Sequence, residues 1–254
     1  MAPDQAPASL PAEQVTRFWS LHRRWLLLAG LTLGLSLFFI WLPGPARTAL
    51  WAALQAQQTL IGLFGLLALL VLSLLWSAGE RLDIRIFLFL NQRGYRSRWL
   101  DRGLWLATQL GNVAAAFVLA GLLWGLNDRR LAVEMLLGTL TLGLLVETLK
   151  TLLGRERPFL TLTQTRIVGG RERGRSFPSG HTAQVFFLLT LLVYRFQPEL
   201  GGLLGLAAVA GLVGFTRVYV GAHYPRDVLA GAALGAIWGM LTVLIDPYWS
   251  GYHF

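Results

Sequence analysis

The 254-residue chain contains no cysteine, a single lysine and few charged residues, which make up only 14% of it. Without cysteine it forms no disulfide, no cysteine metal site and no thiolate nucleophile, so the sequence carries no sign of a redox compartment. Hydrophobic residues account for 55% of the chain and the mean hydropathy is +0.55, values too apolar for a soluble domain. We therefore expect an all-α bundle of helices that crosses a membrane several times.

A formal net charge of +9 is compatible with nucleic-acid binding. The arginines, however, stand in short loops between apolar runs and form no continuous basic face. We therefore expect no nucleic-acid partner, and we expect the basic loops to meet anionic lipid of the bilayer. Nothing in the pattern indicates an oligomeric state.

Hydropathy divides the chain into a basic, disordered tail at residues 1–24, an anchor helix with its connector at 25–57, a membrane core at 58–246 and a tail at 247–254. A span needs about 17 to 25 residues. The pattern predicts a six-helix core preceded by an extra N-terminal transmembrane helix. The predicted spans are 25–42, 60–77, 107–126, 131–153, 181–196, 201–215 and 228–245.

Residues 80–104 differ from these spans because arginines alternate there with large apolar residues. This pattern predicts an amphipathic helix that lies in the plane of the membrane interface. Such a segment either gathers anionic lipids or serves as a solvated connector, and the sequence leaves both interpretations open.

An arginine, a histidine and an aspartate stand together at the edge of long apolar segments, as Arg217, His223 and Asp227. Ionisable groups are costly there unless they have a function. A carboxylate four residues after a histidine can accept its Nδ1 hydrogen, which leaves Nε2 free as a nucleophile. His223 is therefore the candidate nucleophile and Asp227 its orienting group. The alternative is an Arg–Asp pair beside an incidental histidine.

Two other stretches supply groups that bind phosphate. Lys150 precedes Arg157 at the exit of a predicted span, where Pro158 is expected to end the helix. Ser179 and Gly180 form a tight turn before the next helix, and a helix N-terminus favours an anion. Phosphoryl transfer needs such donors and cations around the phosphoryl oxygens, a nucleophile in line and an acid for the leaving oxygen.

Residues 150–158, 178–181 and 217–227 resemble the three ordered signatures of the type 2 phosphatidic acid phosphatase family. This family is the membrane branch of the lipid phosphatase and vanadium haloperoxidase superfamily. The likeness covers about residues 80–246 and departs at Thr216, where the family usually has serine.

The resemblance implies that His223 attacks phosphorus to form a phosphohistidine, that Asp227 orients it and that His181 protonates the leaving oxygen. It implies no metal and no other cofactor. Zinc bound by the histidines and the aspartate is an alternative, although the surrounding cations would repel it. The residues implied to hold the phosphate are Lys150, Arg157, Ser179, Gly180 and Arg217.

The leading hypothesis is thus an integral-membrane lipid phosphatase. Undecaprenyl diphosphate, phosphatidic acid or phosphatidylglycerol phosphate, and lipid A phosphate remain candidate substrates, because the motifs hold only the phosphate. Transfer of the phosphate to another acceptor is an enzymatic alternative. A lipid or anion transporter is disfavoured because the ionisable residues cluster at helix ends and no inverted repeat is present. The loop 166–175 either contacts a head group or second phosphate, or is a solvated basic loop.

The side of the membrane on which the site lies is a further expectation. Arg17, Arg23 and Arg24 favour a cytoplasmic N-terminus, and with seven spans this counting places the catalytic face in the cytoplasm. Resemblance to bacterial members implies the opposite, the outer face of the cytoplasmic membrane, and we expect the latter. If the first run does not cross, six spans remain and both termini are cytoplasmic.

Overall fold

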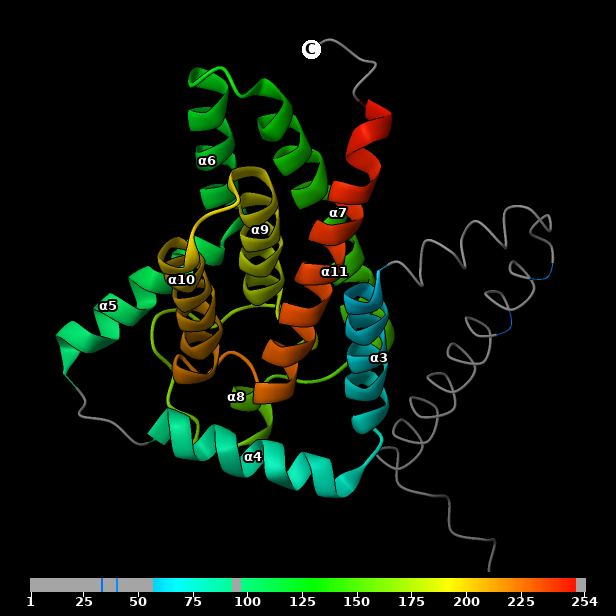
Figure 1. The fold of residues 1–254 in the computed structure, drawn as a ribbon. Coiled ribbons are helices and arrows are strands. Elements are labelled where there is room, and N and C mark those ends of the chain that lie inside the picture. The colour runs from blue at the N-terminus through cyan, green and yellow to red at the C-terminus, as the bar shows by residue number, and fades with distance from the viewer. Residues whose placement is uncertain (1–32, 34–39, 41–56, 93–96, 250–254) are drawn as a thin grey trace, which may run out of the picture. The chain divides into compact units, whose positions relative to one another are not determined.

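The computed structural model describes residues 33, 40, 57–92 and 97–249. Over these residues every regular element is a helix, which confirms the predicted all-helical fold (Figure 1). The helices are α3 (Gln58–Ser73), α4 (Ser77–Gln92), α5 (Arg98–Thr108), the 3-10 helix η1 (Gln109–Gly111), α6 (Val113–Gly125), α7 (Arg129–Leu153), α8 (Pro158–Thr161), α9 (Gly180–Phe196), α10 (Leu200–Tyr219) and α11 (Pro225–Trp249).

The structure bears on only part of the predicted domain organisation. The predicted tail at 1–24 and nearly all of the anchor segment at 25–57 lie outside the described residues. The chain forms a compact unit from Leu54 to Phe254. At its far end α11 runs to Trp249, three residues into the stretch that was expected to be a tail.

Three helical stretches are long and apolar enough to cross a membrane: Arg129–Thr161, Leu200–Tyr219 and Pro225–Leu244. The number rises to five if two bent pairs each count as one span: α3 with α4, bent by 97°, and α5–η1 with α6, bent by 61°. The protein is therefore a multi-pass membrane protein. Six spans were predicted for this part of the chain, and three to five helical stretches meet this criterion of length and composition. The shorter helices α3, α6 and α9 have 16, 13 and 17 residues, at or below the lower end of the roughly 17 to 25 that a span needs.

Two helices cover the stretch 80–104 that was predicted to be amphipathic helix, and its place in the membrane interface stays a prediction. α4 ends at Gln92 and α5 begins at Arg98. The two helices have different partners, since α4 packs on both α10 and α11 whereas α5 packs on α10. α4 buries Phe87 against Val218 and Tyr224, next to the end of α10 and the start of α11.

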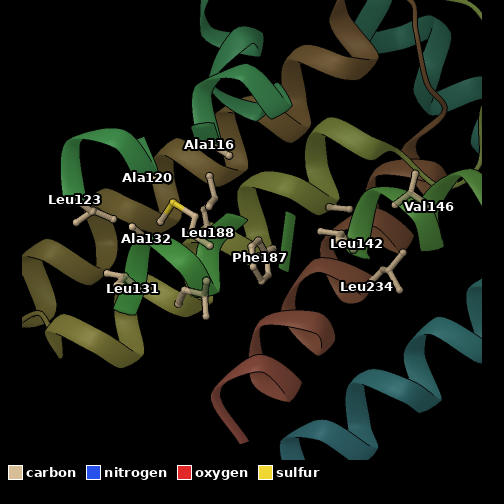
Figure 2. Packing of buried hydrophobic residues seen from close by; sticks show 13 residues of the cluster. Ala116, Ala120, Leu123, Leu131, Ala132, Leu142, Val146, Phe187, Leu188 and Leu234 are labelled. Atoms are coloured by element: carbon tan, nitrogen blue, oxygen red, sulfur yellow. The ribbon is translucent and has the colours of Figure 1, made fainter. Parts of the chain in front are cut away.

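The main hydrophobic core lies between α6, α7, α9 and α11 (Figure 2). Small and large residues are mixed in this cluster, so that the helices pack closely. A buried hydrogen bond of 2.9 Å from Gln184 to Thr139 joins α9 to α7 within this core. Residues labelled in Figure 2 include Ala116, Ala120, Leu131, Ala132, Phe187, Leu188 and Leu234.

A stripe of glycines on α11 lets α9 approach its backbone. Gly231, Gly235 and Gly239 follow one another at intervals of one helical turn. A Cβ atom on Gly231 would lie 2.5 Å from the carbonyl oxygen of Ser179, and one on Gly235 would collide with the backbone of α9. Close packing here brings the starts of α9 and α11 together, and the Ser179 N–H donates to the Asp227 carbonyl at 2.9 Å.

The exit of α7 is shaped by Gly154 and Pro158. Gly154 takes a left-handed conformation with φ of 62°, which ends α7. Pro158, which was expected to end this helix, instead occupies the first turn of α8, where its missing N–H leaves no bond unmade. Arg155 and Arg157 therefore stand on a non-helical connection between the two helices.

Candidate active site

The three sequence motifs meet at the end of the bundle that lies beside α4 and α8 (Figure 1). The C-terminal ends of α7 and α10 and the N-terminal ends of α9 and α11 lie at this end of the bundle. Polar side chains there are almost fully buried, with exposures of 2% for Arg157, 1% for Arg217, 1% for His223 and 0% for Asp227. Charged groups buried within apolar helices are costly and point to a functional site.

His223 lies in the short loop between α10 and α11. Its Nδ1 is 2.7 Å from the carbonyl oxygen of Ser176, and its Nε2 is 3.3 Å from Nη1 of Arg157. A carbonyl only accepts, so Nδ1 carries the hydrogen and Nε2 presents its lone pair. Burial, reinforced by Arg217 and Arg157 against the opposing effect of Asp227, lowers the pKa of His223 to about 4. The imidazole is therefore neutral at neutral pH.

Asp227 lies beside the His223 ring, as the sequence led us to expect, but it is not the group nearest to Nδ1. Its Oδ2 is 3.6 Å from Nδ1, and the Ser176 carbonyl occupies the nearer position. Oδ2 instead accepts hydrogen bonds from the Ser176 hydroxyl and, at 2.8 Å, from the Tyr224 N–H. Asp227 stands in the first turn of α11, and its carboxylate caps this helix by accepting from the N–H group that precedes it. Asp227 thus meets His223 in two ways, directly at 3.6 Å and through Ser176.

Arg155 and Asp83 complete this support, and sequence reasoning missed both. Arg155 donates to Asp227 at 2.5 Å and also to Asp83, and it lies over the Tyr224 ring at 4.1 Å. Asp83 is 2% exposed and accepts from the Arg226 N–H at 3.0 Å. Arg155 could have been found from the sequence, because it stands only two residues before Arg157. Nothing in the sequence linked the second to the site.

Arg157 and Arg217 form the cationic part of the site. Arg157 is held by backbone carbonyls, with Nη1 donating to Ala222 at 3.1 Å and Nε to Gly174 at 3.2 Å. Arg217 donates from Nη1 to Thr108 Oγ1 at 2.7 Å. Among the described residues, its buried Nε has no hydrogen-bond partner. An unused guanidinium donor beside a second arginine is suited to a phosphate oxygen.

Lys150, Ser179 and Gly180 lie where α7 meets the start of α9. A Cβ atom on Gly180 would be 3.9 Å from the Lys150 amine, which itself bonds Glu147 at 2.6 Å. The Ser179 N–H is committed to Asp227, so the expected anion nest is reduced by one donor. The Ser179 oxygen accepts from Thr182 at 2.9 Å, and its own hydroxyl hydrogen can still donate to a ligand.

His181 stands in the first turn of α9. Its backbone packs on Gly111 of η1, where a Cβ atom would lie 2.6 Å from the His181 carbonyl oxygen. Its ring is close enough to Arg217, Glu172 and Lys150 for their charges to act on it, and the same is true of His223. The structure thus brings together both histidines and the cations that the sequence singled out.

The loop 166–175 contributes in a way that neither sequence interpretation anticipated. Its arginines do not reach the site: Arg166 pairs with Asp101 at 2.7 Å, while Arg171, Arg173 and Arg175 are exposed. Glu172 instead turns inward and bonds both Arg157 and Arg217. Burial would raise the pKa of this carboxyl, but Arg217, His223 and Arg157 hold it well below its usual range.

Comparison with known proteins identifies the family. The PAP2 superfamily profile matches residues 131–250, which contain all three motifs. The putative undecaprenyl-diphosphatase YbjG of Escherichia coli strain K12 is 30% identical over 169 residues, which are 65% of this chain and 83% of that protein. This chain belongs to the PAP2 superfamily.

Other PAP2 proteins are similar over different lengths. A lipid A 1-phosphatase of Rhizobium johnstonii is 38% identical over 110 residues, 41% of this chain and 43% of that protein, so the chain spans less than half of that relative. The crystal structure of a transmembrane PAP2-type phosphatidylglycerolphosphate phosphatase from Bacillus subtilis superposes with a TM-score of 0.65 at 25% identity. The alignment covers 76% of this chain and 98% of that one. The family predicted from the motifs is confirmed, and with it the class of enzyme, a PAP2-type membrane lipid phosphatase.

Proposed function

We propose that this protein removes phosphate from a membrane lipid phosphate or diphosphate through a phosphohistidine formed on His223. One observation carries the proposal. The lone pair of a neutral, buried Nε2 lies 3.3 Å from a guanidinium nitrogen of Arg157, and Arg217 binds the same carboxylate as Arg157. A nucleophile beside two convergent cations is the arrangement that in-line phosphoryl transfer requires.

The proposed reaction has two steps. Nε2 of His223 attacks phosphorus, so that an N–P bond forms while the bond from phosphorus to the leaving oxygen breaks, and His181 gives that oxygen a proton. In the second step His181 takes a proton from water as the water oxygen attacks phosphorus, so that a new P–O bond forms while the N–P bond breaks. Inorganic phosphate leaves and His223 is restored. Arg157, Arg217 and Lys150 neutralise charge on the phosphoryl oxygens in both steps, with Ser179 and Gly180 as further donors.

Undecaprenyl diphosphate is the first candidate substrate. The relative of that name aligns over 83% of its own length, whereas the lipid A phosphatase aligns over 43%. Lipid A phosphate is the second candidate because identity in the shared region is higher, 38% against 30%. Phosphatidylglycerol phosphate is the third, since a phosphatase of that name shares the fold.

Phosphate release by the detergent-purified protein tests the proposal. We expect release from one of undecaprenyl diphosphate, lipid A, phosphatidylglycerol phosphate and phosphatidic acid to exceed that from the others. Release from none of the four, together with transfer to an added alcohol, would identify a phosphotransferase instead. Neither release nor transfer would contradict the enzymatic proposal.

Activity is expected to survive exhaustive chelation. The positive charge around the phosphate comes from Arg157, Arg217 and Lys150, and these cations would repel a metal ion. Assay of phosphate release after treatment with a strong chelator and desalting checks this. Loss of activity that zinc or magnesium restores would establish a metal-dependent reaction.

We further propose that the protein resides in the bacterial cytoplasmic membrane with its site on the outer face. The chain has no cysteine, so a single introduced thiol reports its own location. We expect Arg173→Cys, at an exposed position beside Glu172, to react with an impermeant maleimide in intact cells. Glu199→Cys, in the turn between α9 and α10 at the opposite end of the bundle, should react only after the membrane is broken. The reverse pattern would place the site in the cytoplasm.

A further inference from the structure

Glu172 places its carboxylate between the two buried arginines of the site. Its Oε2 is 2.8 Å from Nη1 of Arg157, and its Oε1 bonds Nη2 of Arg217. The same Oε2 lies 3.9 Å from Nε2 of His223. A single carboxylate therefore bridges two guanidinium groups directly in front of the candidate nucleophile.

The position of this carboxylate matches the one that a phosphoryl group needs. Two phosphoryl oxygens would use the same arginine donors, and phosphorus would have to come within about 3 to 3.5 Å of Nε2 before attack. With a carboxylate oxygen 3.9 Å from Nε2, the two anions exclude each other. Catalysis at His223 consequently requires Glu172 to leave.

The negative charge of Glu172 explains why its side chain occupies the site when no phosphate is bound. Arg157 and Arg217 are buried side by side, with side-chain exposures of 3% and 1%. Two buried cations without a counter-ion are costly, and one carboxylate neutralises both. The side chain of Glu172 is 32% exposed and comes from a loop, so it can rotate outward more readily than either arginine.

The backbone of the loop is anchored while this side chain is not. Arg157 holds the carbonyl of Arg173 at 3.1 Å and that of Gly174 at 3.2 Å, directly after Glu172. Rotation of the Glu172 side chain towards solvent therefore clears the site without unfolding the loop. Arg157 keeps its bonds to backbone carbonyls in this rotation, and Arg217 keeps its bond to the Thr108 hydroxyl.

We propose that Glu172 is the protein's own occupant of the phosphate position, and that a substrate phosphate must displace it, so that this residue sets the affinity of the site for phosphoryl groups. The inference rests on the proposed function, which assigns Arg157, Arg217 and His223 to phosphate. When only a fraction of molecules is open to a ligand, the apparent dissociation constant is the intrinsic one divided by that fraction. Removing the competing charge should therefore tighten phosphate binding.

Binding of inorganic phosphate to the full-length protein in detergent tests the inference, measured by calorimetry and by thermal unfolding. Glu172→Gln keeps the size of the side chain and removes its charge. We expect its dissociation constant for phosphate to fall about tenfold or more. We also expect a lower Tm without phosphate, because the arginines lose their counter-ion, and a larger rise in Tm on adding phosphate.

Glu156→Gln is the matched control, because Glu156 pairs with Arg175 at 3.7 Å on the exposed surface nearby. It removes the same charge and should bind phosphate as the wild type does. If Glu172→Gln does not fold, Glu172→Asp retains the charge with a shorter reach and should also bind phosphate more tightly than wild type. Unchanged or weaker phosphate binding in the Glu172 variants would overturn the inference.

Failure of the proposed function gives a different result. If phosphate binds neither wild type nor Glu172→Gln, the assignment of Arg157 and Arg217 to phosphate is wrong, and the role of Glu172 is wrong with it. If phosphate binds both equally, the phosphate site stands and only the role of Glu172 is lost.

Discussion

Alanine in place of His223 is expected to lower turnover of the lipid substrate by about 10⁴-fold or more, the scale of loss when a hydrolase loses its nucleophile. The physical reason is that alanine removes Nε2, which the Ser176 carbonyl leaves unprotonated and Arg157 faces at 3.3 Å. Affinity for phosphate should persist, because Arg157 and Arg217 remain. Phosphate release and calorimetric phosphate binding measure the two effects separately.

His181→Ala provides the matched comparison for this variant. Its proposed task is to protonate the leaving oxygen, which an acidic leaving group does not need. His181→Ala should therefore lose most activity with a lipid phosphate and retain much of it with p-nitrophenyl phosphate, whereas His223→Ala should be inactive with both. Ordinary turnover by His223→Ala would end the phosphohistidine hypothesis.

Asparagine in place of Asp227 is expected to lower the rate by roughly 10²-fold or more and to destabilise the fold. A direct Asp–His contact in a catalytic triad is worth about 10⁴-fold. Here the carboxylate is 3.6 Å from Nδ1 and also acts through Ser176, so a smaller loss is expected. The asparagine amide must also point its NH₂ group at Arg155 or at the other donors that Asp227 accepts from, the Ser176 hydroxyl and the Tyr224 N–H. Breaking a buried ion pair such as Asp227–Arg155 costs about 3 to 5 kcal/mol of folding stability.

Asp83→Asn is the control that separates rate from stability. Asp83 and Asp227 pair with the same guanidinium, that of Arg155, but Asp83 makes no bond to Ser176 or His223 among the described residues. Both substitutions should lower the Tm, and only Asp227→Asn should slow phosphate release in protein that remains folded. Equal rates for the two variants would show that Asp227 serves only the fold.

Hydropathy located the helices but misplaced two helix ends at which a charge is buried. α10 was predicted to stop at residue 215, yet it continues to Tyr219 and carries Arg217 in its last turn. α11 was predicted to begin at residue 228, yet it begins at Pro225 and includes Asp227. A hydropathy pattern ends at an ionisable residue, while the folded chain continues the helix because tertiary partners satisfy the charge. Thr108 and Glu172 do so for Arg217, and Arg155 for Asp227.

The sequence by itself determined the class of the protein and the chemical inventory of its site. Apolar runs predicted the membrane helices, and three spaced motifs identified the family because side-chain type and order are properties of the chain alone. Only the tertiary structure decided which atoms meet. It placed the Ser176 carbonyl rather than Asp227 nearest Nδ1 of His223, brought Asp83 of α4 to Arg155, and set Glu172 between Arg157 and Arg217. These contacts join residues far apart in sequence at distances of a few ångströms, which depend on how closely the helices and the loop pack.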